Sequence, residues 1–170
     1  MTLAVKQARS ERRSVTRRKV ILAKDRGEIA QNVQTTRQTR RRKGINKLLQ
    51  NIYGKPRLLS NILRDGGLSE NEVERLRRNY MNEYLTLLVL RWENWWRKHL
   101  SPREKEILGP RFCLKGKPKP SIETLAKKQD VAPNVVKWSE ASAVRRLQDD
   151  VRKSEFEEIV LQAGREILSR

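Results

Sequence analysis

The side chains of this sequence best suited to a chemical task are its lysines and arginines, and that task would be to bind phosphate. The chain has 39 of them against 20 acidic residues, a formal net charge of +19. Such an excess attracts polyphosphates and releases their counterions on binding. Residues 1–57 hold 17 basic and 3 acidic side chains, whereas residues 58–170 hold 22 and 17. We therefore expect nucleic acid as the partner, with the strongest positive field in the first third of the chain.

The residue types that carry most catalysis and metal binding are scarce. His99 is the single histidine and Cys113 the single cysteine, and no carboxylates accompany them at the spacing of metal ligands. The sequence contains no glycine-rich phosphate loop, and the pair at 149–150, Asp-Asp, indicates charges at a helix end. We expect no catalytic residues, no metal site and no cofactor. The protein is therefore not expected to be an enzyme.

Residues 1–43 predict a basic arm. Clusters of basic side chains at 12–13, 17–19 and 40–43 are separated by polar segments that have no apolar period. A segment of this composition repels itself and is expected to stay disordered until it meets phosphate. The alternative is a solvated tail that only solubilises or targets the protein. The side chains of the arm that we expect to contact DNA are Arg40, Arg41, Arg42 and Lys43.

Residues 44–99 predict a helical domain. Apolar residues at helical spacing indicate short helices over 45–52 and 58–63, and a capping box at 69–72 starts one long helix that reaches about His99. Tryptophans near its end favour contact with protein, either in the core or across an oligomer interface, and stacking on bases is the alternative. These tryptophans are Trp92, Trp95 and Trp96.

The apolar segments are too short to cross a membrane. The longest apolar run, Leu87–Leu90, falls far short of the roughly 20 residues that span a bilayer. The first residues of the chain lack the apolar core of a secretory signal. We expect no membrane partner and a location in the bacterial cytoplasm, at the nucleoid.

The following part of the chain predicts three helices around a tight turn. A capping box at 101–104 starts the first helix, and the glycine-proline pair at 109–110 is expected to break or kink it. After a basic loop, residues 121–128 and 133–147 predict two helices joined by a short turn at residues 129–132. Ala126 is small enough to let these two helices cross closely. Two helices joined in this way are the geometry of a major-groove reader.

This segment, residues 100–147, resembles region four of bacterial primary sigma factors. The motifs that carry the resemblance are LSPREKEIL followed by RF, then SIETLAKK, and finally EASAVRRL. The resemblance implies a helix-turn-helix that reads the upstream promoter element while its opening helices hold the flap of RNA polymerase. By position it assigns polymerase contact to four apolar side chains, for which plain core packing is the alternative. They are Ile107, Leu108, Phe112 and Leu125.

The resemblance also implies a basic DNA-binding surface on the last two helices. Asn134 could pair with adenine, and Lys137 could reach guanine or a phosphate. For the two arginines that close the motif, the alternative is a solvated helix end that complements the helix dipole. The DNA-contacting residues expected in this segment are Lys128, Asn134, Lys137, Trp138, Arg145 and Arg146.

The sequence departs from the family where the family reads bases. An Arg-Glu pair and an Arg-Gln pair are replaced here by Pro133-Asn134 and Lys137-Trp138, and the N-cap of the last helix is Ala132. Nothing upstream of residue 100 resembles the sigma region that melts promoter DNA. We therefore expect altered recognition of DNA, and a protein other than a complete initiation factor.

A capping box at Ser154 and Glu157 predicts a last amphipathic helix, which either folds back onto the tryptophan helix or docks on a partner. The expected fold is all-α, with a helical domain, a C-terminal helix-turn-helix and a basic, disordered N-terminal arm. Its segments are 1–43, 44–99, 100–150 and 154–170.

The expected function is that of a DNA-binding transcription protein that engages RNA polymerase, promoter DNA or both. Two alternatives remain at this point. One is a DNA-packaging or structural nucleoprotein subunit of a phage or mobile element, with the aromatic helix as its oligomer interface. The other is an RNA-binding protein built on the same scaffold.

Overall fold

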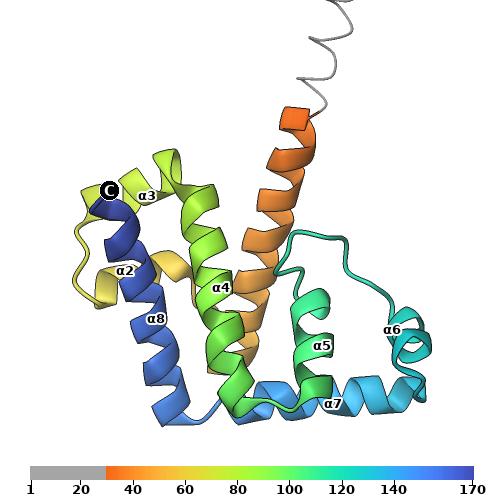
Figure 1. Ribbon diagram of the computed structural model, residues 1–170. Coiled ribbons are helices and arrows are strands. Elements are labelled where there is room, and N and C mark those ends of the chain that lie inside the picture. The colour runs from red at the N-terminus through yellow and green to blue at the C-terminus, as the bar shows by residue number, and fades with distance from the viewer. Residues whose placement is uncertain (1–29) are drawn as a thin grey trace, which may run out of the picture. The chain divides into compact units, whose positions relative to one another are not determined.

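The computed structural model describes residues 30–170, and every regular element in that range is an α-helix (Figure 1). This confirms the predicted all-α class. The chain divides into two units, Met1–Thr36 and Arg37–Arg170, and the second contains the core. The arm contacts expected within residues 1–29 lie outside the described residues. The labelled helices are α2 (Leu59–Asp65), α3 (Glu70–Asn79), α4 (Met81–His99), α5 (Pro102–Arg111), α6 (Ile122–Gln129), α7 (Pro133–Leu147) and α8 (Asp150–Leu168).

A further helix, called here the N-terminal helix, begins at residue 30 and ends at residue 53. It includes residues 30–43, which we expected to belong to a disordered arm. These residues have no apolar period of their own, but they extend a helix that the following turns anchor in the core. Extending a helix is much easier than starting one, because nucleation is the costly step. The anchoring side chains are buried as the periodicity predicts: Ile45, Leu48, Leu49 and Ile52.

The long helix expected from residue 69 to residue 99 is instead two helices, α3 and α4. The break lies at Tyr80, whose φ of −128° and ψ of 15° are not helical. The amide of Tyr80 still donates to the carbonyl of Leu76, and its own carbonyl accepts from Tyr84. The apolar stripe continues across the break, so its periodicity does not reveal it. The bend lets α3 pack on both α2 and α8 while α4 runs on through the core.

The helix α5 runs past its proline, although we expected a break or kink at residues 109–110. Pro110 lies in the last turn of the helix, which ends at Arg111. A proline in that position removes a single backbone hydrogen bond. The amide of Phe112 donates to the carbonyl of Leu108 and the amide of Cys113 to that of Pro110, so the chain closes the helix end at once.

The helix α8 begins earlier than predicted. Its N-cap is Asp149, whose Oδ1 accepts hydrogen bonds from the amides of Val151 and Arg152. The capping box predicted at Ser154 is therefore wrong, because that residue lies inside the helix. An aspartate at an N-cap satisfies free amides and complements the helix dipole, which is the helix-end role expected for the Asp-Asp pair.

The core lies mainly between α4 and α8, which run side by side as predicted for a C-terminal helix that folds back (Figure 1). The Trp92 ring stacks on Phe156 with 4.2 Å between ring centroids. The indole N–H of Trp95 donates to Glu155 across 2.7 Å. The tryptophans at 92, 95 and 96 are only 0%, 9% and 2% exposed. The core alternative therefore holds for these tryptophans, and the possible oligomer interface through them is wrong, since their own chain already covers them.

None of the helices in residues 30–170 is long and apolar enough to cross a bilayer.

Candidate nucleic-acid interface

Helices α6 and α7 are joined by a turn of three residues, 130–132. Ser121 starts α6, and its hydroxyl accepts from the amide of Thr124 at 3.0 Å. Asp130 ends the helix in the left-handed region, with a φ of 50°. The amide of Val131 then returns to the carbonyl of Ala126 at 3.0 Å, and Pro133 occupies the first position of α7, where a missing N–H has no effect. The turn is therefore fixed by backbone bonds on one side and by a proline on the other.

A small apolar core holds α5, α6 and α7 together. Its buried members are Ile107, Leu125, Ala126 and Val136. Ala126 is 2% exposed, in keeping with the close helix crossing that its small side chain predicts. This core sits beneath α7 and leaves the opposite face of that helix uncovered.

The four side chains to which the sigma resemblance assigned polymerase contact are all buried. Their exposed fractions lie between 0% and 5%, and two of them, Leu108 and Phe112, belong to the main core. The core-packing alternative therefore holds for these side chains, which hold the helices in place and are not exposed for contact with polymerase. The four buried side chains are Ile107, Leu108, Phe112 and Leu125.

The exposed face of α7 carries the predicted DNA-contacting side chains. Exposed residues recur three and four positions apart, which places them in one stripe along the helix. Trp138 lies in the middle of this stripe and is 69% exposed. We call the following set the α7 stripe: Asn134, Lys137, Trp138, Ala141 and Arg145.

Two further predicted residues lie outside this stripe. Lys128 is exposed near the end of α6. Arg146 is exposed on α7, but its Nε lies 3.3 Å from the Glu104 carboxylate of α5. Arg146 therefore has an internal partner and contributes less free positive charge than its neighbour Arg145.

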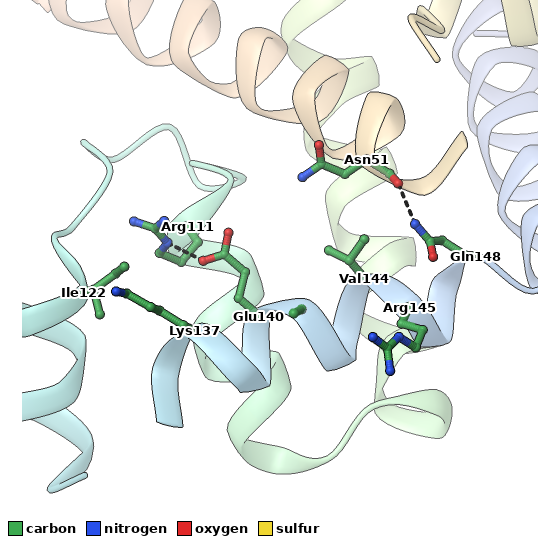
Figure 2. Close-up of a pocket in the computed structure, with 9 residues that line it drawn as sticks. Asn51, Arg111, Ile122, Lys137, Glu140, Val144, Arg145 and Gln148 are labelled. Atoms are coloured by element: carbon green, nitrogen blue, oxygen red, sulfur yellow. Dashed lines mark hydrogen bonds and ion pairs between the residues drawn. The ribbon is translucent and has the colours of Figure 1, made fainter. Parts of the chain in front are cut away.

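A hollow of about 480 Å³ lies beside the α7 stripe (Figure 2). Figure 2 shows Lys137 reaching from α7 toward Ile122 of α6. Opposite, the Nε of Arg111 lies 2.6 Å from Glu140 in an ion pair whose side chains are only 13% and 22% exposed. The residues that line the hollow are Asn51, Arg111, Ile122, Lys137, Glu140, Ala141, Val144, Arg145 and Gln148.

Polar contacts fix one wall of the hollow. Arg111 also donates to the carbonyl of Pro120 at 3.3 Å, and Gln148 donates to the carbonyl of Asn51 at 2.9 Å. The first bond ties the end of α5 to the loop before α6, and the second ties the end of α7 to the end of the N-terminal helix. The four residues joined by these bonds were not predicted as site residues: Asn51, Arg111, Pro120 and Gln148. Arg111 stood in the RF motif without an assigned role, and its pairing with a residue 29 positions away has no local signal.

Glu104 connects the start of α5 to the middle of α7. It completes the predicted capping box by accepting from the backbone amide of Ser101 at 2.7 Å, and it also accepts from the hydroxyl of Ser142 at 2.8 Å. Burial by itself raises the pKa of this carboxyl group. The hydrogen bonds from Ser101 and Ser142, together with the nearby charge of Arg146, outweigh burial, so the pKa of Glu104 lies below its ordinary value.

Replacing Glu104 with glutamine is expected to destabilise the protein by about 1–3 kcal/mol at neutral pH, because buried donors lose their charged acceptor. A carboxyl whose pKa is lowered by folding adds stability above its unfolded pKa and loses it as the pH falls toward the folded pKa. The difference in Tm between wild type and Glu104→Gln should therefore shrink on acidification. Glu83→Gln, at an exposed position of α4, is the control. A difference that stays constant from neutral to acidic pH would contradict this role.

The basic cluster at 40–43 does not form one surface. Arg41 is half-buried and donates to the hydroxyl of Thr86 in α4 at 2.8 Å, and burial lowers the pKa of its guanidinium. Arg40, Arg42 and Lys43 are exposed. Arg42 and Lys43 line a different hollow, of about 370 Å³, whose walls are mostly apolar side chains of α2, α3 and α4. Of the four predicted DNA contacts in this cluster, three are exposed, and Arg41 is bound inside the protein.

Groups of three or more histidine, cysteine or acidic side chains that could hold a metal ion do not occur within residues 30–170. Comparison of the chain with known protein families, with curated proteins and with solved structures finds no match.

Proposed function

We propose that the protein binds nucleic acid through the exposed face of α7, with double-stranded DNA as its main ligand. The observation that carries the proposal is the α7 stripe, in which cationic and amide side chains stand uncovered on a helix that a three-residue turn joins to α6. Side chains of these types bind phosphates and base edges in the major groove. The excess of 39 basic over 20 acidic residues supplies the long-range attraction.

A role in transcription is part of the proposal, and the sigma-like motifs of residues 100–147 are its support. The residues to which that resemblance assigned DNA contact lie at exposed positions of α6 and α7. The residues to which it assigned polymerase contact lie in the core. RNA polymerase would therefore have to bind other side chains of this protein. We therefore place DNA first and RNA polymerase second among the proposed partners, in a bacterial cytoplasm.

The packaging alternative loses its main argument. It relied on the aromatic helix as an oligomer interface, and the tryptophans of α4 are covered by α8 of the same chain.

The test is the binding of a labelled DNA duplex at several salt concentrations, measured by fluorescence anisotropy. Replacing Lys137 and Arg145 together with alanine is expected to weaken binding on the order of tenfold or more. The slope of log affinity against log salt should fall by about 0.9 for each phosphate that the variant no longer binds. Replacing Arg97 and Lys98, which are exposed in the last turn of α4, removes the same charge from another element and should change little. Equal reductions in affinity for the two double variants would show that only net charge matters and would contradict the proposal.

The same assay separates base contacts from phosphate contacts. Lys137→Ala alone is expected to change the preference among duplex sequences. Replacing Arg40, Arg42 and Lys43 with alanine should weaken all duplexes alike, because phosphate contacts carry no sequence information. Arg41 is left intact in this variant, since it donates to Thr86 inside the protein.

A further inference from the structure

Trp138 is placed unlike the other tryptophans of the chain. It is 69% exposed, whereas the other three tryptophans are at most 9% exposed. It lies in the middle of the α7 stripe, directly after Lys137. Its neighbours along the stripe, Asn134 and Ala141, have short side chains and leave the indole surface open. An open aromatic surface beside cationic side chains is a common arrangement for holding bases.

The chemistry of indole limits what this residue can recognise. Indole has one N–H donor and no acceptor, so Trp138 cannot form the paired hydrogen bonds by which asparagine, glutamine or arginine read a base edge. Its strength is its flat apolar face. In a continuous duplex, however, neighbouring base pairs already cover both faces of each base. A base can stack on Trp138 only after it has left the base stack.

We propose that the α7 stripe selects nucleic acid that contains an unpaired base, which stacks on Trp138 while Arg145 holds an adjacent phosphate. The proposal rests on the proposed function and deepens it, because it names the structural class of ligand. It gives the exposed indole a role that duplex binding alone does not need. Stacking tolerates any base, so Trp138 recognises the unpaired state and not a particular base.

The first experiment uses the fluorescence of the protein's own tryptophans. Three of the four are buried, so quenching by acrylamide reports mainly on Trp138. Two probes are compared: a perfectly paired DNA hairpin, and the same hairpin with one extra unpaired nucleotide. The bulged hairpin is expected to bind about tenfold more tightly, which is within the range of one base–aromatic stack, and to protect the fluorescence from acrylamide. Equal affinity and equal protection with both hairpins would overturn the inference.

The second experiment uses variants. Trp138→Ala should bind the bulged hairpin no better than the paired one and should keep the wild-type affinity for the paired one. Trp138→Phe keeps an aromatic face and should retain most of the preference. Leu90→Ala, at a position of α4 that is 55% exposed, removes an exposed apolar side chain elsewhere and should keep the full preference.

The outcomes separate the two proposals. If Trp138→Ala weakens both hairpins alike, or neither, the stacking role is refuted while nucleic-acid binding stands. If Trp138 contacts a protein partner and not a base, Trp138→Ala should weaken the binding of neither hairpin. If the wild type binds neither hairpin, the proposed function fails and the inference fails with it.

Discussion

Gly44→Ala is expected to lower the Tm of the protein by on the order of 10 °C, because overpacking against backbone costs about 1–3 kcal/mol or more. A Cβ at this position would lie 1.7 Å from the carbonyl oxygen of Phe112 and 2.7 Å from its carbonyl carbon. Backbone atoms cannot rotate away as the end of a side chain can. The N-terminal helix and the chain that follows α5 would have to separate. Thermal unfolding followed by circular dichroism measures the effect.

Gly109→Ala is the matched control. Gly109 also lies in a helix, α5, but a Cβ there would meet nothing within 4 Å. Alanine is favoured over glycine in a helix by about 1 kcal/mol, so this variant is expected to be neutral or slightly more stable. If both alanine variants unfolded at the temperature of the wild type, the close approach at Gly44 would be refuted.

Trp92→Ala is expected to destabilise the protein by about 3–5 kcal/mol, the usual range for removing a large aromatic side chain from a core. Trp92 is 0% exposed and packs against both Phe156 of α8 and Trp96 of its own helix. Its removal would open a cavity between α4 and α8. Urea denaturation gives the change in unfolding free energy.

A phenylalanine at position 92 serves as the comparison. Trp92→Phe preserves an aromatic ring against α8 and removes an indole N–H that is buried without a hydrogen-bond partner among the described residues. It should therefore be much less destabilising than Trp92→Ala. Equal destabilisation by the two substitutions would mean that the stack contributes little. The two results together measure how firmly α8 is held to α4.

Local patterns predicted much of the fold. The apolar spacing of residues 45–52 indicated the buried side of the N-terminal helix, and the capping boxes at Ser69 and Ser101 indicated where α3 and α5 begin. Each of these signals involves residues within four positions of one another. The break at Tyr80 escaped prediction, because the same apolar stripe serves one bent pair of helices as well as one straight helix.

The candidate site was predicted in part. The exposed positions of α7 follow from the spacing of its buried residues, so its outward stripe could be read from the sequence. The contacts that hold α7 in place could not be read from the sequence. Glu104 meets Ser142 across 38 residues, and Arg111 meets Glu140 across 29. Such pairs depend on how helices are stacked in space, and a single sequence contains no local sign of them. Polymerase contact was assigned by position from the sigma resemblance, and the side chains concerned are buried.

The close approach at Gly44 also bears on two separate sets of exposed side chains, residues 42–43 and the α7 stripe, which we call the two cationic surfaces. Residue 44 immediately follows the exposed side chains of residues 42 and 43, and the backbone that it touches leads from α5 toward α6. Both surfaces therefore belong to one compact unit, Arg37–Arg170. If one ligand reaches both, the second contact forms at a high effective concentration, so the two affinities multiply instead of adding. A ligand too short to bridge them would lack this chelate effect, and the dependence of affinity on ligand length would then reveal the span between them.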